Sequence, residues 1–136
     1  MSTIMPRKRI ASQPDSSVRA NGRDLEPAFE RLRKAAERLP EVETGNSYGT
    51  PALKVGKKSF CRVKDADTVV LMVDLEEKEM LMAAAPELFF ETDHYRGWPA
   101  MLVRIRAIPD DELRHRLRKA WLMKAPKALA RTLPPG

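Results

Sequence analysis

The sequence predicts an α+β fold, a two-layer sandwich in which one antiparallel sheet carries helices on one of its faces. Two observations predict it. Apolar residues recur every three or four positions in the segments 25–39, 75–85 and 110–124, which is the spacing of a half-buried helix. The segments between them alternate apolar and polar residues and are joined by short turns, as consecutive strands are. The predicted order is therefore α-β-β-β-α-β-β-α.

The first predicted helix covers residues 25–39. Asp24 is a suitable N-cap, and Pro27 lies in the first turn, where its missing N–H costs little. Phe29 and Leu32 lie on its apolar face. Pro40 ends the helix, because proline removes a backbone donor. We expect Phe29 in the core.

An acidic loop and then three strands are expected next, over residues 52–55, 59–64 and 68–73. Gly56 and Lys57 form a tight turn between the first two strands, because glycine adopts positive φ at little cost. Alternating apolar and polar residues in each segment indicate strands with one buried face. Three consecutive strands joined by two short connections predict a meander.

The second half of the chain supplies a helix, two strands and a last helix. Asp74 is expected to cap a helix over residues 75–85, and Pro86 ends it. Strands are predicted over residues 88–92 and 99–107. Asp110 and Asp111 favour the start of the final helix, since negative charge is stabilising there. Pro126 interrupts that helix.

Strand alternation divides the side chains between two faces of the sheet. The apolar rows, which contain Leu53, Val69, Leu71 and Val103, are expected to meet the helices. The opposite, open face is expected to hold Phe60 and five cations, namely Lys54, Arg62, Lys64, Arg104 and Arg106. An ordinary solvated face would fit this pattern, but five cations without a carboxylate favour a face that binds anions.

Length and charge bound the possible functions. A chain of 136 residues is long enough for one domain whose core needs no metal or disulfide. The net charge of +6 is uneven, with +4 in residues 1–23, −5 in residues 24–93 and +7 in residues 94–136. This polarity favours an anionic partner.

Residues 1–23 contain few large apolar side chains and show no periodicity, so we expect a disordered basic leader. The alternative is that residues 1–23 form a basic arm that binds the phosphates of a polyanion. The folded domain is expected over residues 24–131, with a short tail over residues 132–136. No apolar run approaches the roughly 20 residues needed to span a bilayer, and the start of the chain lacks a secretory signal. With Cys61 as its single cysteine, the chain is expected to be soluble and cytoplasmic, with no membrane partner.

The sequence predicts no catalytic or metal site and no cofactor. His94 and His115 lie in different elements, and no residues have metal-ligand spacing. Asp93 could orient His94 as a base that accepts a proton, but one adjacent pair of this kind is typical of an ordinary surface turn. Cys61 falls on the apolar side of its strand, which indicates an inert core thiol. We therefore expect a protein that is not an enzyme.

Several short motifs resemble, in order and spacing, those of the MmcQ/YjbR family. A helix ending in Leu39-Pro40 precedes a hairpin of the pattern S-[YFW]-G-x-P-x-[FL]-K-V, here Ser47 to Val55. An H-x-x-x-[WY] element follows at residues 94–98, and an I-P-D-x-E-L helix start at residues 108–113. Trp121 and Ala125-Pro126-Lys127 also match the family's C-terminal end, so the resemblance covers roughly residues 25–131.

This resemblance implies the family's α-β(3)-α-β(2)-α fold. It also implies DNA binding, because the family is commonly described as DNA-binding from the likeness of its fold to a double-wing domain of a phage transcription factor. That description rests on fold analogy, and a fold alone does not determine a function.

Two functions from different classes follow. In the first, the open face and its turns bind DNA weakly, in a salt-dependent way and largely through phosphate. The residues expected to carry it are six cations and three aromatic residues available for stacking: Lys54, Lys57, Lys58, Arg62, Arg104, Arg106, Tyr48, Tyr95 and Trp98.

In the second, the domain is a non-enzymatic module for a small anionic ligand or an acidic protein partner. Its compact site would be lined by Thr50, Lys54, His94, Tyr95 and Trp98. The placement of the cations distinguishes the two functions. Cations strung along a groove would favour nucleic acid, whereas cations that converge beside aromatic residues would favour a pocket.

Overall fold

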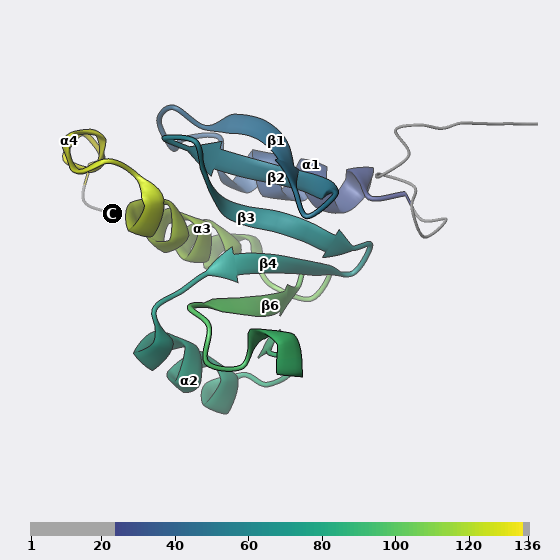
Figure 1. The fold of residues 1–136 in the computed structure, drawn as a ribbon. Helices are drawn as coiled ribbons and strands as arrows, with labels where there is room; N and C mark the ends of the chain where they lie inside the picture. Colours follow the sequence, from purple (N-terminus) through teal and green to yellow (C-terminus); the bar gives the residue numbers. More distant parts are fainter. Residues whose placement is uncertain (1–23, 135–136) are drawn as a thin grey trace, which may run out of the picture.

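The computed structural model describes residues 24–134 and confirms the α+β architecture (Figure 1). Six strands form one antiparallel sheet in the order β1-β2-β3-β4-β6-β5. The strands are β1 (Glu43–Ser47), β2 (Thr50–Val55), β3 (Lys58–Asp65), β4 (Thr68–Met72), β5 (Phe89–Phe90) and β6 (Ala100–Arg104). The helices are α1 (Glu26–Ala35), α2 (Leu75–Ala84), α3 (Asp110–Lys124) and the single turn α4 (Lys127–Ala130). The leader expected over residues 1–23 lies outside the described residues.

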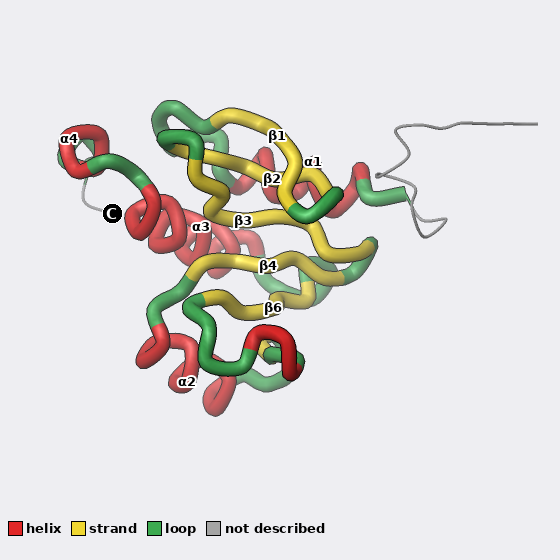
Figure 2. The backbone as a smooth tube through the Cα atoms, in the orientation of Figure 1, coloured by secondary structure: helices red, strands yellow, loops and turns green. Residues whose placement is uncertain are grey.

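Helices α1 and α3 cover one face of the sheet, where they pack on β2, β3 and β4 (Figure 1). Helix α2 packs beside β5 and β6 at one end of the sheet. Within residues 24–134, the other face is not covered by α1 or α3. The segment between β5 and β6, with a short 3-10 turn at Asp93–Tyr95, folds over part of it (Figure 2). We call this uncovered side the open face.

The core lies between the sheet and the two covering helices. Leu53, Cys61, Leu71 and Met101 occupy matching positions on β2, β3, β4 and β6, and all four are buried in one cluster. Phe29 from α1 and other predicted apolar residues, Val69 and Val103 among them, join the same cluster, as the alternation predicted. Fully buried Trp121 of α3 donates a hydrogen bond from its indole Nε1 to the Pro40 carbonyl oxygen at 3.0 Å.

Local signals in the sequence explain where the helices begin. Pro27 lies in the first turn of α1, and the Asp24 carboxylate accepts a hydrogen bond from the Glu26 N–H. The Asp74 side chain accepts hydrogen bonds from two backbone N–H groups of α2, as its predicted N-cap role requires. Helix α1 ends earlier than predicted, because residues 36–39 continue only as turns.

Strand β1 was not predicted. Its sequence, Glu-Thr-Gly-Asn-Ser, has no large apolar residue and was interpreted as an acidic loop. The strand forms because it is at the edge of the sheet, where pairing with β2 satisfies its backbone and little side-chain burial is required. The predicted strand over 99–107 is also shorter, since residues 105–107 form a turn.

The prediction that Phe60 lies on the open face was wrong. Leu53 pairs with Cys61, but the next residue of β2, Lys54, pairs with Ser59, so Phe60 is an extra residue in β3. Such a bulge changes the alternation of side chains at this point. Phe60 is consequently fully buried in the core cluster, beside Cys61.

Arg116 of α3 is a charged residue that the fold buries. Its side chain is only 6% exposed and donates a hydrogen bond from Nη1 to Oε2 of Glu77 on α2 at 2.9 Å. Helical periodicity could not reveal this contact, because it depends on where α2 packs. None of the helices within residues 24–134 is long and apolar enough to cross a lipid bilayer.

Candidate functional site

Arg62 is the central cation of the open face. It lies on β3, and its strand neighbours Ala52 and Val70 lie at the same level of the sheet. Its guanidinium donates one hydrogen bond to the Tyr95 hydroxyl at 2.5 Å and another to the Thr50 hydroxyl at 3.2 Å. The half-buried side chain is therefore fixed at the point where β2, β3 and the 93–98 segment meet.

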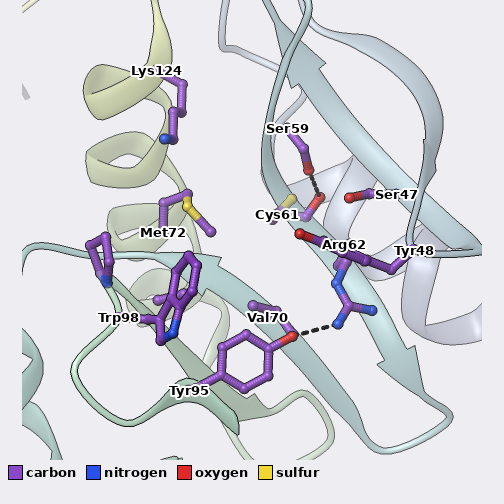
Figure 3. Close-up of a pocket in the computed structure, with 12 residues that line it drawn as sticks. Ser47, Tyr48, Ser59, Cys61, Arg62, Val70, Met72, Tyr95, Trp98 and Lys124 are labelled. Atoms are coloured by element: carbon purple, nitrogen blue, oxygen red, sulfur yellow. Dashed lines mark hydrogen bonds between the residues drawn. The ribbon is translucent and has the colours of Figure 1, made fainter.

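Three aromatic residues surround Arg62. The ring of Tyr48 lies over the guanidinium, with 5.1 Å between the Cζ atom and the ring centroid, which is cation–π distance. Tyr95 accepts the hydrogen bond, and Trp98 faces Arg62 across a cavity (Figure 3). We call Tyr48, Arg62, Tyr95 and Trp98 the Arg62 cluster.

Tyr48 is held in an unusual position. It and Gly49 form the turn between β1 and β2, with φ of +53° and +81°. Two consecutive positive φ values are typical of a type I′ hairpin, which favours Asn-Gly or Gly-Gly. A bulky tyrosine in this conformation is disfavoured, and here it is also 87% exposed. The contact with Arg62 is a reason within the described fold for an aromatic residue at this position, and most of the ring nevertheless remains exposed.

Lys78 fixes the segment that carries Tyr95 and Trp98. This lysine of α2 is only 2% exposed, and its ammonium donates to the carbonyl oxygens of Tyr95 and Trp98 at 2.7 and 2.9 Å. Its Nζ also lies 2.7 Å from a carboxylate oxygen of Glu91. The three contacts match the three donors of an ammonium group. Helix α2 thus positions one wall of the site.

Glu77, the neighbour of Lys78 in α2, links this helix to α3. Its Oε2 accepts hydrogen bonds from Arg116 at 2.9 Å and Lys119 at 3.1 Å, and Arg116 also lies 3.4 Å from Glu112. Desolvation raises the pKa of Glu77, but the two hydrogen bonds outweigh it, so the pKa lies below its ordinary value of 4.5. The carboxylate therefore stabilises the contact between α2 and α3.

The Glu77→Gln substitution is expected to reduce the free energy of unfolding more near neutral pH than in acid. Because the folded pKa is lowered, the contribution of Glu77 is present above about pH 4.5 and is lost as the pH falls through the folded value. Urea unfolding of both proteins near neutral pH and at about pH 3 would measure this difference. Glu79→Gln, which changes an exposed residue of the same helix, is the control. An undiminished difference in acid would contradict the assignment.

Two adjoining cavities open beside the Arg62 cluster and share its four residues. The first has a volume of about 300 Å³ and is also lined by Val70, Met72, Ala100 and Lys124. The second, of about 560 Å³, is lined in addition by Lys64, Thr92 and His94. The volumes fall within the range of small-molecule sites, roughly 300–1,000 Å³. Figure 3 shows Arg62 and Tyr48 on one side of the first cavity, with Trp98 and Lys124 across from them.

The floor of the first cavity is apolar. Val70, Ala100 and Leu102 form a small buried cluster on the open side of the sheet, and Met72, Phe90 and Tyr95 pack against it. Part of the open face is thus a hydrophobic surface that the 93–98 segment covers only in part.

Five of the six predicted cations fall into three groups. Arg62 and Arg104 share the open face, as expected, and the Arg104 guanidinium lies 4.3 Å from the ring centroid of Phe90. Lys57 and Lys58 are exposed at the β2–β3 turn, at the end of β2 opposite Tyr48. Arg106 lies beyond the end of β6 and pairs with Asp67 at 2.8 Å.

Five cations of this region, Lys54, Arg62, Lys64, Arg104 and Lys124, form no ion pair with a carboxylate among the described residues. The ion pairs of residues 24–134 lie mainly on the helices and at the 91–96 turn. The open face and its cavities therefore hold five of the described cations that have no carboxylate partner, although other such cations, Lys34 and Lys57 among them, lie elsewhere on the domain.

The residues of the alternative pocket are only partly brought together. His94, Tyr95 and Trp98 line the second cavity, and His94 packs edge-on against Tyr95 with 4.9 Å between the ring centroids. Thr50 contacts the site by accepting a hydrogen bond from Arg62. Lys54 lines neither of the two cavities, and its stem lies against Gly45.

The residues weighed for chemistry lie at or near the cavities, where His94 lines the second cavity and Cys61 adjoins the first. Asp93 receives a hydrogen bond from Arg96 at 2.6 Å, and His94 is an exposed residue of the turn. Cys61 is 1% exposed, and burial raises the pKa of its thiol far above the ordinary value. A thiol in this state is a poor nucleophile.

Sequence reasoning missed Lys78 and Lys124 and left Lys64 out of the proposed site. Lys78 occurs in a mixed acidic and apolar helix whose hydrophobic periodicity is weak, so no pattern indicated its burial. Lys124 reaches the first cavity from the last turn of α3. Both roles depend on contacts between distant segments.

Comparisons with known proteins agree with this fold. A family model described as YjbR matches residues 37–123. The chain is 44% identical over 52 residues to the uncharacterized proteins Rv2570 of Mycobacterium tuberculosis (strain ATCC 25618 / H37Rv) and Mb2600 of Mycobacterium bovis. These matches span 38% of this chain and 40% of each relative.

A crystal structure of the Deinococcus radiodurans protein DR2400, with a DUF419 domain, superposes with a TM-score of 0.60. It covers 70% of this chain and 76% of that one at 22% identity, so the likeness concerns the fold alone.

Proposed function

The chain belongs to the YjbR family, and on that premise we propose that it is a non-enzymatic protein that binds nucleic acid weakly on the open face of its sheet. The observation that carries the proposal is that cations without a carboxylate partner among the described residues continue along the open face beyond the cavities, from Arg62 on β3 to Arg104 on β6, beside the aromatic residues of the Arg62 cluster. Cations of this kind contact phosphate, and exposed aromatic rings stack on bases.

The affinity is expected to be modest. The described domain has a small net charge, because the acidic residues of 24–93 offset much of the basic C-terminal part. Binding without sequence preference has a dissociation constant on the order of 10⁻⁴ to 10⁻⁶ M at physiological salt. Of the predicted cations, Arg62 and Arg104 are best placed to contribute, whereas Arg106 is engaged by Asp67.

A salt titration tests this proposal. Binding of the full-length protein to a labelled random DNA is measured by fluorescence anisotropy over a range of salt concentrations. The double variant Arg62→Ala, Arg104→Ala is expected to reduce the slope of log affinity against log salt by about two, one for each lost phosphate contact.

The charge-matched control is Lys34→Ala with Arg114→Ala. These two exposed residues lie on the helices α1 and α3 and line a separate depression between them. Their loss should change the slope much less. Absence of binding by the unmodified protein even at low salt would contradict the proposal, as would equal effects of the two double variants.

A small anionic ligand with a flat ring is the second candidate. The convergence of Arg62 and Lys124 with Tyr95 and Trp98 around a cavity of about 300 Å³ favours it. The cations at the β2–β3 turn, Lys57 and Lys58, would then have no part in binding.

A further inference from the structure

From the shape and lining of the first cavity, and resting on the proposed function, we infer that the Arg62 cluster takes an unpaired base and that the protein therefore prefers single-stranded nucleic acid to duplex. The first cavity combines an apolar floor of Val70 and Ala100 with Trp98 in its wall. A flat apolar ring can occupy such a space with its faces in contact with protein.

Duplex nucleic acid cannot offer a ring in this way. Each base in a duplex has both faces covered by its neighbours and its pairing edge turned to its partner. Only a base in a single strand, or one rotated out of the stack, can enter a cavity lined by aromatic residues. Phosphate contacts alone would not make this distinction.

The charges beside the cavity fit the backbone of such a strand. Arg62 and Lys124 line the first cavity, and Lys64 lines the adjoining one. Since both cavities share Tyr48, Arg62, Tyr95 and Trp98, a strand with one base in the first cavity would continue past Lys64 in the second. The arrangement of stacking surface beside cations is that of a single-strand site.

Two aromatic side chains, Trp98 and Tyr48, are exposed to solvent in positions that do not favour the stability of the fold. Trp98 is 62% exposed although Lys78 holds its backbone in place, and Tyr48 is 87% exposed in a left-handed conformation. Exposed aromatic area and an unfavourable φ both reduce stability. The contact with Arg62 accounts for part of the position of Tyr48, and a role in binding accounts for the exposed area that both rings retain.

The experiment compares a labelled single strand of mixed sequence, about 20 nucleotides long, with the same strand annealed to its complement, using the full-length protein at low salt. The single strand is expected to bind at least about tenfold more tightly. Trp98→Ala is expected to weaken its binding about 5- to 100-fold, with little effect on the duplex. Met80→Ala, which removes a residue of similar exposure on α2, should change neither affinity.

Tyr48→Asn separates binding from folding. Asn-Gly is a preferred pair for a type I′ turn, so the melting temperature should be unchanged or higher. Binding of the single strand should nevertheless weaken. A variant that melts higher but binds equally well would overturn the role of Tyr48.

Three further outcomes would overturn the inference. In the first, strand and duplex bind equally, Trp98→Ala has no effect, and Arg62→Ala with Arg104→Ala weakens binding. This result would contradict the base cavity but would agree with the proposed function. Equally tight binding of thymidine monophosphate would assign the cavity to a free nucleotide. Absence of binding to every nucleic acid would refute both the inference and the proposed function.

Discussion

Replacing Lys78 with methionine is expected to lower the free energy of unfolding by about 3–5 kcal/mol, as the loss of one partner of a buried ion pair does. Methionine has a similar length and can fill the same space. However, it leaves the carbonyl oxygens of Tyr95 and Trp98 and the Glu91 carboxylate without their donor. The Glu91 side chain is 23% exposed and can regain some water, which favours the lower end of this range.

Urea unfolding measures this loss of stability. Two further variants show whether it comes from the buried position and from the unpaired Glu91 charge. Lys34→Met makes the same replacement at an exposed position of α1 and should change stability little. Lys78→Met with Glu91→Gln removes the uncompensated charge and should recover part of the loss. A loss of less than about 1 kcal/mol in Lys78→Met would show that the buried contacts of Lys78 do not hold the 91–98 segment.

The second large effect is expected for Trp121→Ala, also about 3–5 kcal/mol. Trp121 is fully buried near the C-terminal end of α3, in the core cluster between this helix and the sheet. Its truncation leaves a cavity and also removes the hydrogen bond to Pro40. The loss should therefore exceed that of a purely apolar truncation of the same size.

Trp121→Phe separates the two contributions. Phenylalanine keeps much of the ring volume but leaves the Pro40 carbonyl oxygen unpaired, which should cost about 1–3 kcal/mol. Both variants are compared with the unmodified protein by urea unfolding followed by circular dichroism. If Trp121→Ala were as stable as Trp121→Phe, the ring would contribute nothing to the core.

The sequence predicted the parts of the fold that depend on local patterns. Alternation in β2, β3, β4 and β6 placed Leu53, Leu71 and Val103 correctly, and the capping residue Asp74 marked the start of α2. Phe60 was misplaced because the bulge inserts one residue, and alternation beyond such a point cannot be followed from sequence alone.

The candidate site was predicted as a list of residues but not as an arrangement. Arg62, Tyr48, Tyr95 and Trp98 stood out individually as basic or aromatic residues near turns. Their convergence depends on how the 91–98 segment folds back across β4 and β6, and the buried contacts of Lys78 fix that path. Contacts of this kind join residues far apart in sequence, so no local pattern reports them.

The polar composition of β1 has a consequence for how the protein behaves at high concentration. The two outermost strands of a sheet expose unpaired backbone groups that can recruit a strand from another molecule. Here β1 combines Glu43, Gly45 and Asn46 with no large apolar side chain, and the opposite edge, β5, is only two residues long. Neither edge offers a long, flat, hydrophobic strand for aggregation. The composition that concealed β1 from pattern analysis thus protects the sheet from edge-to-edge association.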